Sequence, residues 1–314
     1  MHRDAAPGAA GPAAGRTFVV LNPAARGGEA ARLQARLAAA FRARRASFDL
    51  ALTEAPGHAT ELARGAAQAG YRAVCAVGGD GTLAEVATGL AGGDVPLAVI
   101  PRGTANQVAA NLGIPRRLEA AVDVAVHGAA TPVDLGRVNG RAFALMVGAG
   151  LDAAVMAATT PALKERWGFG AYLYAAARTV LNLAPSEFTL VADGVERRVQ
   201  AVSVMVANVG ELFASFFPIG LALAPRPAGS WRDGLLDVLV VAPRGVPGFA
   251  GVLAQSAFRR FGGKTLVHFQ AREISIATER PLPVQVDGDL AGSTPLTASV
   301  VRGGVRILTP GRLP

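Results

Sequence analysis

The residues best suited to chemistry lie in the stretch 77–82, which contains three glycines, one carboxylate and one threonine. The apolar run 73–77 predicts a buried strand before the turn, and the apolar spacing of 83–90 predicts a helix after it. A glycine-rich turn at a helix N-terminus presents main-chain N–H groups that suit a phosphate. The carboxylate of Asp80 would repel that phosphate unless a divalent metal lay between them. The stretch therefore predicts metal-assisted phosphate binding, although helix capping by Asp80 or Thr82 in a tight turn would explain the same residues.

This turn belongs to a longer alternating pattern of strands and helices. Apolar runs predict strands at 16–21, 47–52, 71–77 and 95–100, and helices at 29–45, 59–70, 83–90, 107–112 and 118–127. Such alternation is typical of a doubly wound α/β domain with a parallel sheet. Each predicted strand is followed by a loop that combines glycine with Asn, Thr, Asp or Arg, and ligands of these sheets bind beyond the carboxyl ends of the strands. We therefore expect four loops to form one phosphate site, with coincidental turn chemistry as the alternative.

After residue 130 the pattern changes to short apolar runs, separated by turns such as Asp193-Gly194 that are typical of hairpins. Strands are predicted at 131–138, 142–148, 187–192, 199–208, 235–242, 265–270, 273–278, 282–287 and 300–308. Helical insertions are expected at 161–183 and 246–261. The second part of the chain is therefore predicted to be a mostly antiparallel β domain with helical insertions.

The change of pattern sets the expected domain boundaries. A chain of 314 residues is long enough for two domains with cores of their own. We expect the first domain at 16–130 and the second at 131–295, with the last apolar run in 296–314 able to rejoin the first sheet. Residues 1–15 are rich in Ala, Gly and Pro and lack a long apolar segment, so we expect a disordered tail and no signal peptide.

The charge balance favours an anionic partner. The chain has 31 Lys and Arg against 23 Asp and Glu, a net charge of +8. No basic run interleaved with aromatic residues indicates nucleic-acid binding, so we expect an anionic membrane surface and no nucleic acid. Segments 164–174 and 249–264 combine basic and aromatic residues and are candidates for peripheral membrane contact, although packing against the second domain explains each slightly better. The single cysteine, Cys75, rules out a disulfide framework and indicates a cytoplasmic protein.

Three motifs, followed by two later ones, occur in order along the chain. They are Val-Leu-Asn-Pro at 20–23, Gly-Gly-Asp-Gly-Thr at 78–82 and Pro-Arg-Gly-Thr-Ala-Asn at 101–106, then Asp-Gly-Leu-Leu-Asp at 233–237 and Val-Asp-Gly-Asp at 286–289. As a set they resemble the diacylglycerol kinase catalytic-domain family, which includes bacterial lipid kinases and the sphingosine kinases. The second motif alone resembles NAD kinases as well.

This resemblance implies an ATP- and Mg²⁺-dependent kinase that phosphorylates a lipid hydroxyl. It implies an NAD kinase-like first domain for the nucleotide and a lipid site in the cleft between the domains. Diacylglycerol, converted to phosphatidic acid, is the leading acceptor, and a sphingoid base, phosphatidylglycerol or another lipid alcohol stays open. The residues implied to hold the nucleotide are Asn22, Arg26, Thr53, Gly78, Gly79, Gly81, Thr82, Gly103, Thr104 and Asn106.

The resemblance also gives roles to acidic residues. Asp80 would bind the catalytic Mg²⁺, and Asp287 would act as general base near the lipid hydroxyl. By local rules Asp287-Gly288 is also a hairpin turn, and the two roles are compatible. Asp233 with the carbonyl of Leu235 would form a structural metal site. Substrate contacts are implied for two further residues, Asp134 and Asp289.

The chain departs from the family pattern at three positions. Arg26-Gly27 stands where some relatives carry Gly-Lys, Gln107 where many carry Asp, and Ser230 where the structural metal site would have a second Asp. These departures leave open a nucleotide- or lipid-binding protein without catalysis. An NAD kinase-like phosphotransferase is the other alternative, and the 101–106 motif and Asp287 stand against it. An edge strand of the second domain would allow a homodimer.

Overall fold

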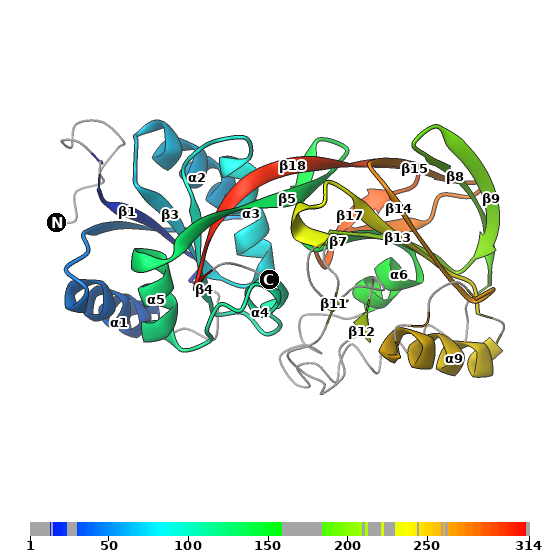
Figure 1. Ribbon diagram of the computed structural model, residues 1–314, viewed down its shortest axis with the longest axis horizontal. Coiled ribbons are helices and arrows are strands. Elements are labelled where there is room, and N and C mark those ends of the chain that lie inside the picture. Colours follow the sequence, from blue (N-terminus) through cyan, green and yellow to red (C-terminus); the bar gives the residue numbers. More distant parts are fainter. Residues whose placement is uncertain are drawn as a thin grey trace.

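The computed structural model describes residues 13, 15–23, 30–158, 184–208, 211–212, 221–222, 230–243, 245–258, 260 and 263–311. Its first half alternates strands with helices (Figure 1). In chain order these are β1 (Thr17–Leu21), α1 (Ala30–Ala43), β2 (Phe48–Leu52), α2 (His58–Gln68), β3 (Ala73–Gly78), α3 (Asp80–Leu90), β4 (Leu97–Pro101), α4 (Gln107–Asn111) and α5 (Leu118–His127). Strands β2, β1, β3 and β4 lie side by side in that order, and neighbours are parallel. The predicted α/β sheet is confirmed.

The parallel sheet is covered on both faces because its strands are apolar on both faces. Strand β3 is buried along its whole length, and its side chains alternate between two cores. Val74 and Ala76 share a core with residues of α2 and α3, whereas Cys75 and Val77 share one with α1 and α5. A strand buried on both sides has a continuous apolar sequence, which is the pattern that predicted it.

The second half contains two sheets packed face to face. Its elements are β5 (Ala129–Val138), β6 (Arg141–Phe143), β7 (Met146–Gly150), α6 (Leu151–Ala158), β8 (Ser186–Ala192), β9 (Val195–Ala201), β10 (Ser203–Ala207), β11 (Glu211–Leu212), β12 (Leu221–Ala222), η1 (Ser230–Arg232), β13 (Leu236–Val241), α9 (Gly245–Ala257), β14 (Leu266–Ala271), β15 (Glu273–Thr278), β16 (Pro283–Val286), β17 (Asp289–Ser293) and β18 (Leu296–Thr309). The second sheet has the order β14-β13-β10-β7-β16-β17 and is antiparallel throughout. The core between the sheets includes Phe188, Ile274, Val204 and Val286. The predicted antiparallel β domain is confirmed as a sandwich.

Several predicted elements differ in extent from those observed. The single strand expected at 142–148 is two strands, because the main-chain N–H groups of Ala144 and Leu145 are bonded to Asp287. The single strand expected at 199–208 is divided between β9 and β10. Helix α6 and strand β17 were not predicted, because α6 starts directly after β7 and both elements are too short for a clear periodic pattern.

The two predicted helical insertions have different outcomes. The segment 246–261 corresponds largely to α9, whereas 161–183 lies outside the described residues. None of the described helices is both long enough and apolar enough to cross a lipid bilayer.

Strands β5 and β18 connect the two halves as a long antiparallel pair (Figure 1). Near its end β18 pairs in parallel with β4 through Ile307, and near its start it pairs antiparallel with β15. The register between β18 and β5 shifts between Val301 and Val305, which marks a bulge. The two halves therefore share one continuous sheet, and the predicted boundary at 130–131 lies inside β5.

Asp134 of β5 stabilises the connection between the two halves through hydrogen bonds. Its side chain is only 3% exposed. One carboxylate oxygen accepts the N–H of Gly234 at 2.7 Å, and the other accepts the N–H of Gly303 in the β18 bulge at 2.6 Å. Both oxygens are thus used by main-chain donors in the interior. The structure gives Asp134 a structural role, and the substrate contact that the resemblance implied stays a prediction.

We predict that Asp134→Asn lowers the free energy of unfolding by about 1–3 kcal/mol, because an amide leaves one buried N–H without an acceptor. Chemical denaturation of the two proteins measures this difference. Asp94→Asn is the matched control, since Asp94 is 92% exposed and pairs with Arg306 only at the surface. A midpoint for Asp134→Asn equal to that of the control would contradict the structural role.

Candidate active site

The loops that follow β1, β3 and β4 meet at the carboxyl ends of these strands. Asn22, just after β1, donates its side-chain amide to the hydroxyl of Thr82 on α3 at 3.1 Å. A Cβ on Gly103 would lie 2.5 Å from the Cα of Gly79, and a Cβ on Gly78 would lie 2.5 Å from the Thr82 hydroxyl oxygen. Close packing therefore requires glycine here, and the structure brings together the loops that were predicted to meet. We call this region the glycine rim, made of residues 22, 78–82 and 103–106.

Asn106 shapes the third loop of the glycine rim. It is 5% exposed and has a φ of 50°. Its Oδ1 accepts the N–H of Gly103 at 2.8 Å, and its Nδ2 donates to the Gly103 carbonyl at 2.7 Å. Thr104 is exposed beside it, and the Thr104 carbonyl accepts a hydrogen bond from Arg116 at 3.2 Å. Of these two predicted nucleotide contacts, Thr104 faces outward while the Asn106 amide is bonded to the loop itself.

Asp80 is the first residue of α3, but it caps a different helix. Its two carboxylate oxygens accept the N–H groups of Gln107 at 3.0 Å and Val108 at 3.1 Å, both in the first turn of α4. Asn106, at the N-cap position of α4, makes no side-chain bond of this kind. Burial raises the pKa of Asp80, whereas the main-chain donors lower it. Asp80 therefore caps α4 and not its own helix α3, where the capping alternative had expected it.

The loop after β2 is also held by α3. The N–H of Thr53 donates to the carbonyl of Leu21 at 3.0 Å, which places Thr53 beside the end of β1. Glu85 of α3 accepts the N–H groups of Gly57 at 2.9 Å and Ala59 at 3.1 Å at the start of α2. Sequence analysis missed Glu85, because no local pattern connects it with residues so far away. Arg26 lies outside the described residues.

The second sheet contributes the turn between β16 and β17. Asp287 and Gly288 have φ values of 51° and 94°, as two-residue hairpins require, so the predicted turn is present. The carboxylate of Asp287 accepts three main-chain N–H groups, from Ala144 at 2.8 Å, Leu145 at 2.8 Å and Met146 at 2.9 Å. Burial of the carboxyl group raises the pKa of Asp287 to about 6, the three donors oppose this shift, and the charge of Asp80 adds to it. Asp287 is therefore placed to exchange a proton near neutral pH.

The β16–β17 hairpin faces the start of α3. A Cβ on Gly81 would lie 3.9 Å from a carboxylate oxygen of Asp289. Asp289 is largely exposed and forms an ion pair with Arg141 at 3.4 Å. The short distance between Gly81 and Asp289 places the β16–β17 hairpin next to the glycine rim, so residues of both sheets border one candidate site.

The oxygen donors of the site suit Mg²⁺. Proteins usually hold Mg²⁺ by one or two carboxylates together with substrate phosphates. Each oxygen of Asp80 keeps a lone pair after accepting one N–H. In the described part of the chain, no group of three or more His, Cys, Asp or Glu side chains is arranged to hold a metal. Asp80 therefore fits a metal shared with phosphates better than one held by the protein alone.

At the implied structural metal site, both carboxylate oxygens of Asp233 accept hydrogen bonds from the protein. One oxygen of Asp233 accepts the N–H of Leu235 at 2.9 Å, and the other accepts a long hydrogen bond from Gln270 at 3.4 Å. Burial raises the pKa of Asp233, and the charges of Asp237 and Asp134 raise it further, while the Leu235 N–H lowers it. A metal bound by Asp233 and the Leu235 carbonyl stays a prediction.

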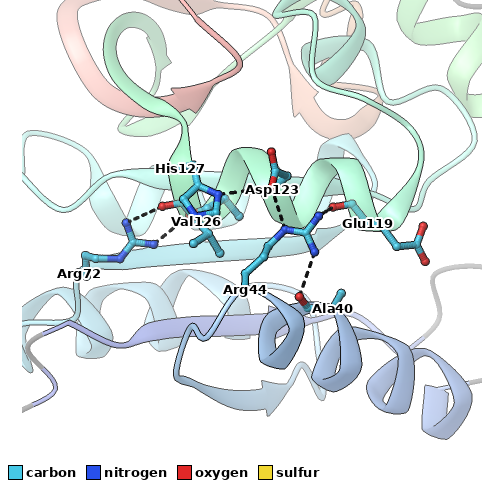
Figure 2. A network of polar contacts seen from close by, with 8 residues as sticks. Ala40, Arg44, Arg72, Glu119, Asp123, Val126 and His127 are labelled. Atoms are coloured by element: carbon cyan, nitrogen blue, oxygen red, sulfur yellow. Dashed lines mark hydrogen bonds and ion pairs between the residues drawn. The ribbon is translucent and has the colours of Figure 1, made fainter.

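A second polar network lies at the opposite, amino-terminal edge of the sheet. Figure 2 shows Arg44, at the end of α1, donating to Asp123 at 3.0 Å and to the carbonyls of Ala40 and Glu119. Arg72 donates to the carbonyl of Val126 at 3.3 Å. These arginines fasten α1 and β3 to α5, so they belong to the scaffold and not to the glycine rim.

Comparisons with known proteins agree with this geometry. The family model described as "Diacylglycerol kinase catalytic domain" matches residues 16–138, and the model described as "YegS C-terminal NAD kinase beta sandwich-like domain" matches residues 145–309. A protein of Bacillus subtilis named "Diacylglycerol kinase" is 29% identical over 77% of this chain and 79% of its own length. A protein of Pseudomonas aeruginosa named "Probable lipid kinase YegS-like" is 31% identical over 82% of this chain and 83% of its own length.

A solved structure shows the same architecture. The crystal structure of a "putative diacylglycerol kinase" from Bacillus anthracis superposes with a TM-score of 0.78 at 28% identity, covering 94% of this chain and 95% of that one. The matched regions include the glycine rim in the first family model and Asp287 in the second. The chain therefore belongs to the diacylglycerol kinase catalytic-domain family of lipid kinases.

Proposed function

We propose that this chain transfers the γ-phosphate of ATP to the hydroxyl of diacylglycerol, with Mg²⁺ bound at Asp80. The observation that carries the proposal is the position of Asp287, whose turn on the second sheet lies at the glycine rim of the first. One substrate can bind each sheet, and the reacting groups can meet between them. The names of the Bacillus and Pseudomonas relatives support a lipid acceptor.

Phosphoryl transfer needs alignment and neutralisation of charge more than covalent chemistry by the protein. Main-chain N–H groups of the glycine rim and the N-terminus of α3 would bind the phosphates. Mg²⁺ at Asp80 would supply positive charge to the phosphate oxygens. Asp287 would orient the lipid hydroxyl and accept its proton as the oxygen bonds to phosphorus and ADP leaves. A carboxyl group with a pKa near 6 is a better proton acceptor than an ordinary aspartate with a pKa near ~3.9.

We further propose a cytoplasmic protein that visits an anionic membrane surface to reach its acceptor. The net charge of +8 supports attraction to such a surface. The charge of Arg44 in Figure 2 is partly offset by its ion pair with Asp123. Pairing of two copies through an edge strand is a further proposal.

The first test incubates the protein with labelled ATP, Mg²⁺ and either diacylglycerol vesicles, a total lipid extract or NAD. We expect labelled phosphatidic acid from wild type and a loss of about 100-fold or more in kcat for Asp287→Asn, since general-base catalysis contributes about 10²–10⁴. Asp193→Asn is the matched control. Asp193 also precedes glycine in a hairpin, has a φ of 46° and accepts main-chain N–H groups of Arg272 and Glu273, but far from the site.

The outcomes of this test are distinct. Equal rates for Asp287→Asn and Asp193→Asn would refute the role of Asp287. Label in NAD would support the NAD kinase-like alternative. Binding of Mg²⁺ and ATP without any labelled product would support a binding protein without catalysis.

The second test is the pH dependence of kcat at saturating substrates. The pKa of Asp287 is raised from 3.8 to about 6. At pH values between these two, the Asp287 carboxyl group of the folded protein is mostly protonated and cannot accept a further proton. We expect kcat to rise with pH to a plateau above about 7, and at pH 5 to be about tenfold below that plateau. Asp193→Asn should keep this profile. A profile that is flat from pH 5 to 8 would contradict the assignment of Asp287.

A further inference from the structure

A chain of buried hydrogen bonds lies behind the Asp287-Gly288 turn. Gln285, two residues before Asp287 on β16, is 3% exposed. Its Oε1 accepts the N–H of Gly288 at 2.8 Å, and its Nε2 donates to a carboxylate oxygen of Asp152 at 3.0 Å. The other oxygen of Asp152 accepts the hydroxyl of Ser203 at 2.7 Å. Three side chains from β16, α6 and β10 thus end on the main chain of the turn.

The carboxylate of Asp152 lies over the sheet where Gly148 has no side chain. Gly148 of β7 pairs with Gln285 on one side and with Met205 of β10 on the other. A Cβ on Gly148 would lie 1.6 Å from a carboxylate oxygen of Asp152, so no other residue allows Asp152 to lie there. Asp152 reaches this position because α6 starts directly after β7, with Gly150 at a φ of 101°. The position of Asp152 therefore explains Gly148, whereas the positive φ of Gly150 and the nearby Val202 carbonyl, 2.4 Å from where a Cβ would lie, explain Gly150.

The carboxylate also fixes the direction of the Gln285 amide. An ionised carboxylate only accepts hydrogen bonds, so it takes the NH₂ group of Gln285 and turns the carbonyl oxygen toward Gly288. Burial raises the pKa of Asp152, and the donors Ser203 and Gln285 lower it. Ser203 is 2% exposed, and both oxygens of Asp152 are already bonded to protein donors.

Hydrogen bonds hold the turn on two sides. Asp287 has a positive φ of 51°, which Asp-Gly hairpins commonly adopt, but the hairpin type alone does not fix the direction of the Asp287 carboxylate. The N–H groups of 144–146 hold its carboxylate, and Gln285 holds the peptide on its other side. With Gln285 removed, the Gly288 N–H loses its acceptor and the direction of the Asp287 carboxylate is no longer set from both sides.

We propose that Gln285 and Asp152 are positioning residues, which set the Asp287-Gly288 turn for phosphoryl transfer without touching either substrate. This inference rests on the proposed function for its catalytic consequence. Its structural part, the restraint of the turn, stands separately. Reacting groups misplaced by about 1 Å lose about 100-fold in rate, so a relaxed turn should lower kcat while substrate binding is kept.

The experiment compares Gln285→Met with wild type. Methionine keeps the volume of glutamine but removes both hydrogen bonds. Gln200→Met is the matched control, because Gln200 is an exposed strand residue of the same domain whose side chain donates to Glu187 at the surface. Hydrogen–deuterium exchange, read by mass spectrometry on peptides that cover 284–290, reports the turn directly. We expect exchange about tenfold faster or more in Gln285→Met and unchanged exchange in Gln200→Met.

Kinetics and a conservative variant complete the test. We expect Gln285→Met to lower kcat about 10- to 100-fold with both KM values within about twofold of wild type. Asp152→Leu should behave alike. Asp152→Asn should restore slow exchange and most of kcat, because Asn can still accept from Gln285 while donating to the Ser203 hydroxyl.

Two results would overturn the inference. One is exchange and kcat in Gln285→Met equal to those of Gln200→Met. The other is a raised KM for the lipid in Asp152→Leu at unchanged kcat, which would make Asp152 a substrate contact. Should wild type transfer no phosphate to any lipid, the proposed function fails, whereas the exchange comparison still decides whether Gln285 restrains the turn. Should Gln285→Met misfold, exchange and kinetics of the two Asp152 variants decide in its place.

Discussion

Carboxylates that are bonded to main-chain N–H groups hold this site together. Asp80 accepts two such groups, Asp134 accepts two and Asp287 accepts three. A buried carboxylate without donors is strongly unfavourable, so each of these residues fixes the main chain that surrounds it. The donors lie far away in sequence, 141 to 143 residues from Asp287. The geometry of the site is therefore set mainly by backbone positions, which change little when neighbouring side chains vary.

In the first sheet, side chains of helix α3 make the hydrogen bonds that hold the neighbouring loops. At its start Asp80 caps α4, one turn later Glu85 caps α2, and between them Thr82 accepts the amide of Asn22. The loops after β1, β2 and β4 are thus all bonded to the helix that follows β3. The triphosphate binding proposed for the rim would need its N–H groups in a fixed arrangement before the ligand binds, and one helix bonded to all of these loops provides that arrangement. The glycines of the rim serve the same arrangement in another way, because the absence of a side chain allows the loops to pack in direct contact.

The parts of this fold that could be predicted are those with a local signal. Strand β3 was evident as an apolar run buried on both faces, and the turn at Asp287 as an Asp-Gly pair between alternating segments. The convergence of the rim loops followed from the geometry of parallel sheets. The capping of α4 by Asp80 and the position of Asp152 over Gly148 could not be predicted, because each depends on a partner chosen by the tertiary fold. Asp134 shows the same limit, since its sequence neighbourhood contains neither Gly234 nor Gly303.

The relative position of the two sheets is set by paired strands and not by a flexible linker. β18 pairs with β4 at Ile307 and with β15 near its start, so one strand borders both halves (Figure 1). Asp134 bonds the bulge of this strand at Gly303 to the turn that leads into β13 of the second sheet. In the proposed reaction, a phosphate on the first sheet and a hydroxyl on the second would keep a fixed separation although the rim and the Asp287 turn share no strand. Transfer between two bound molecules depends strongly on such alignment, so the bulge of β18 and its bond to Asp134 would support the proposed transfer together with the rim.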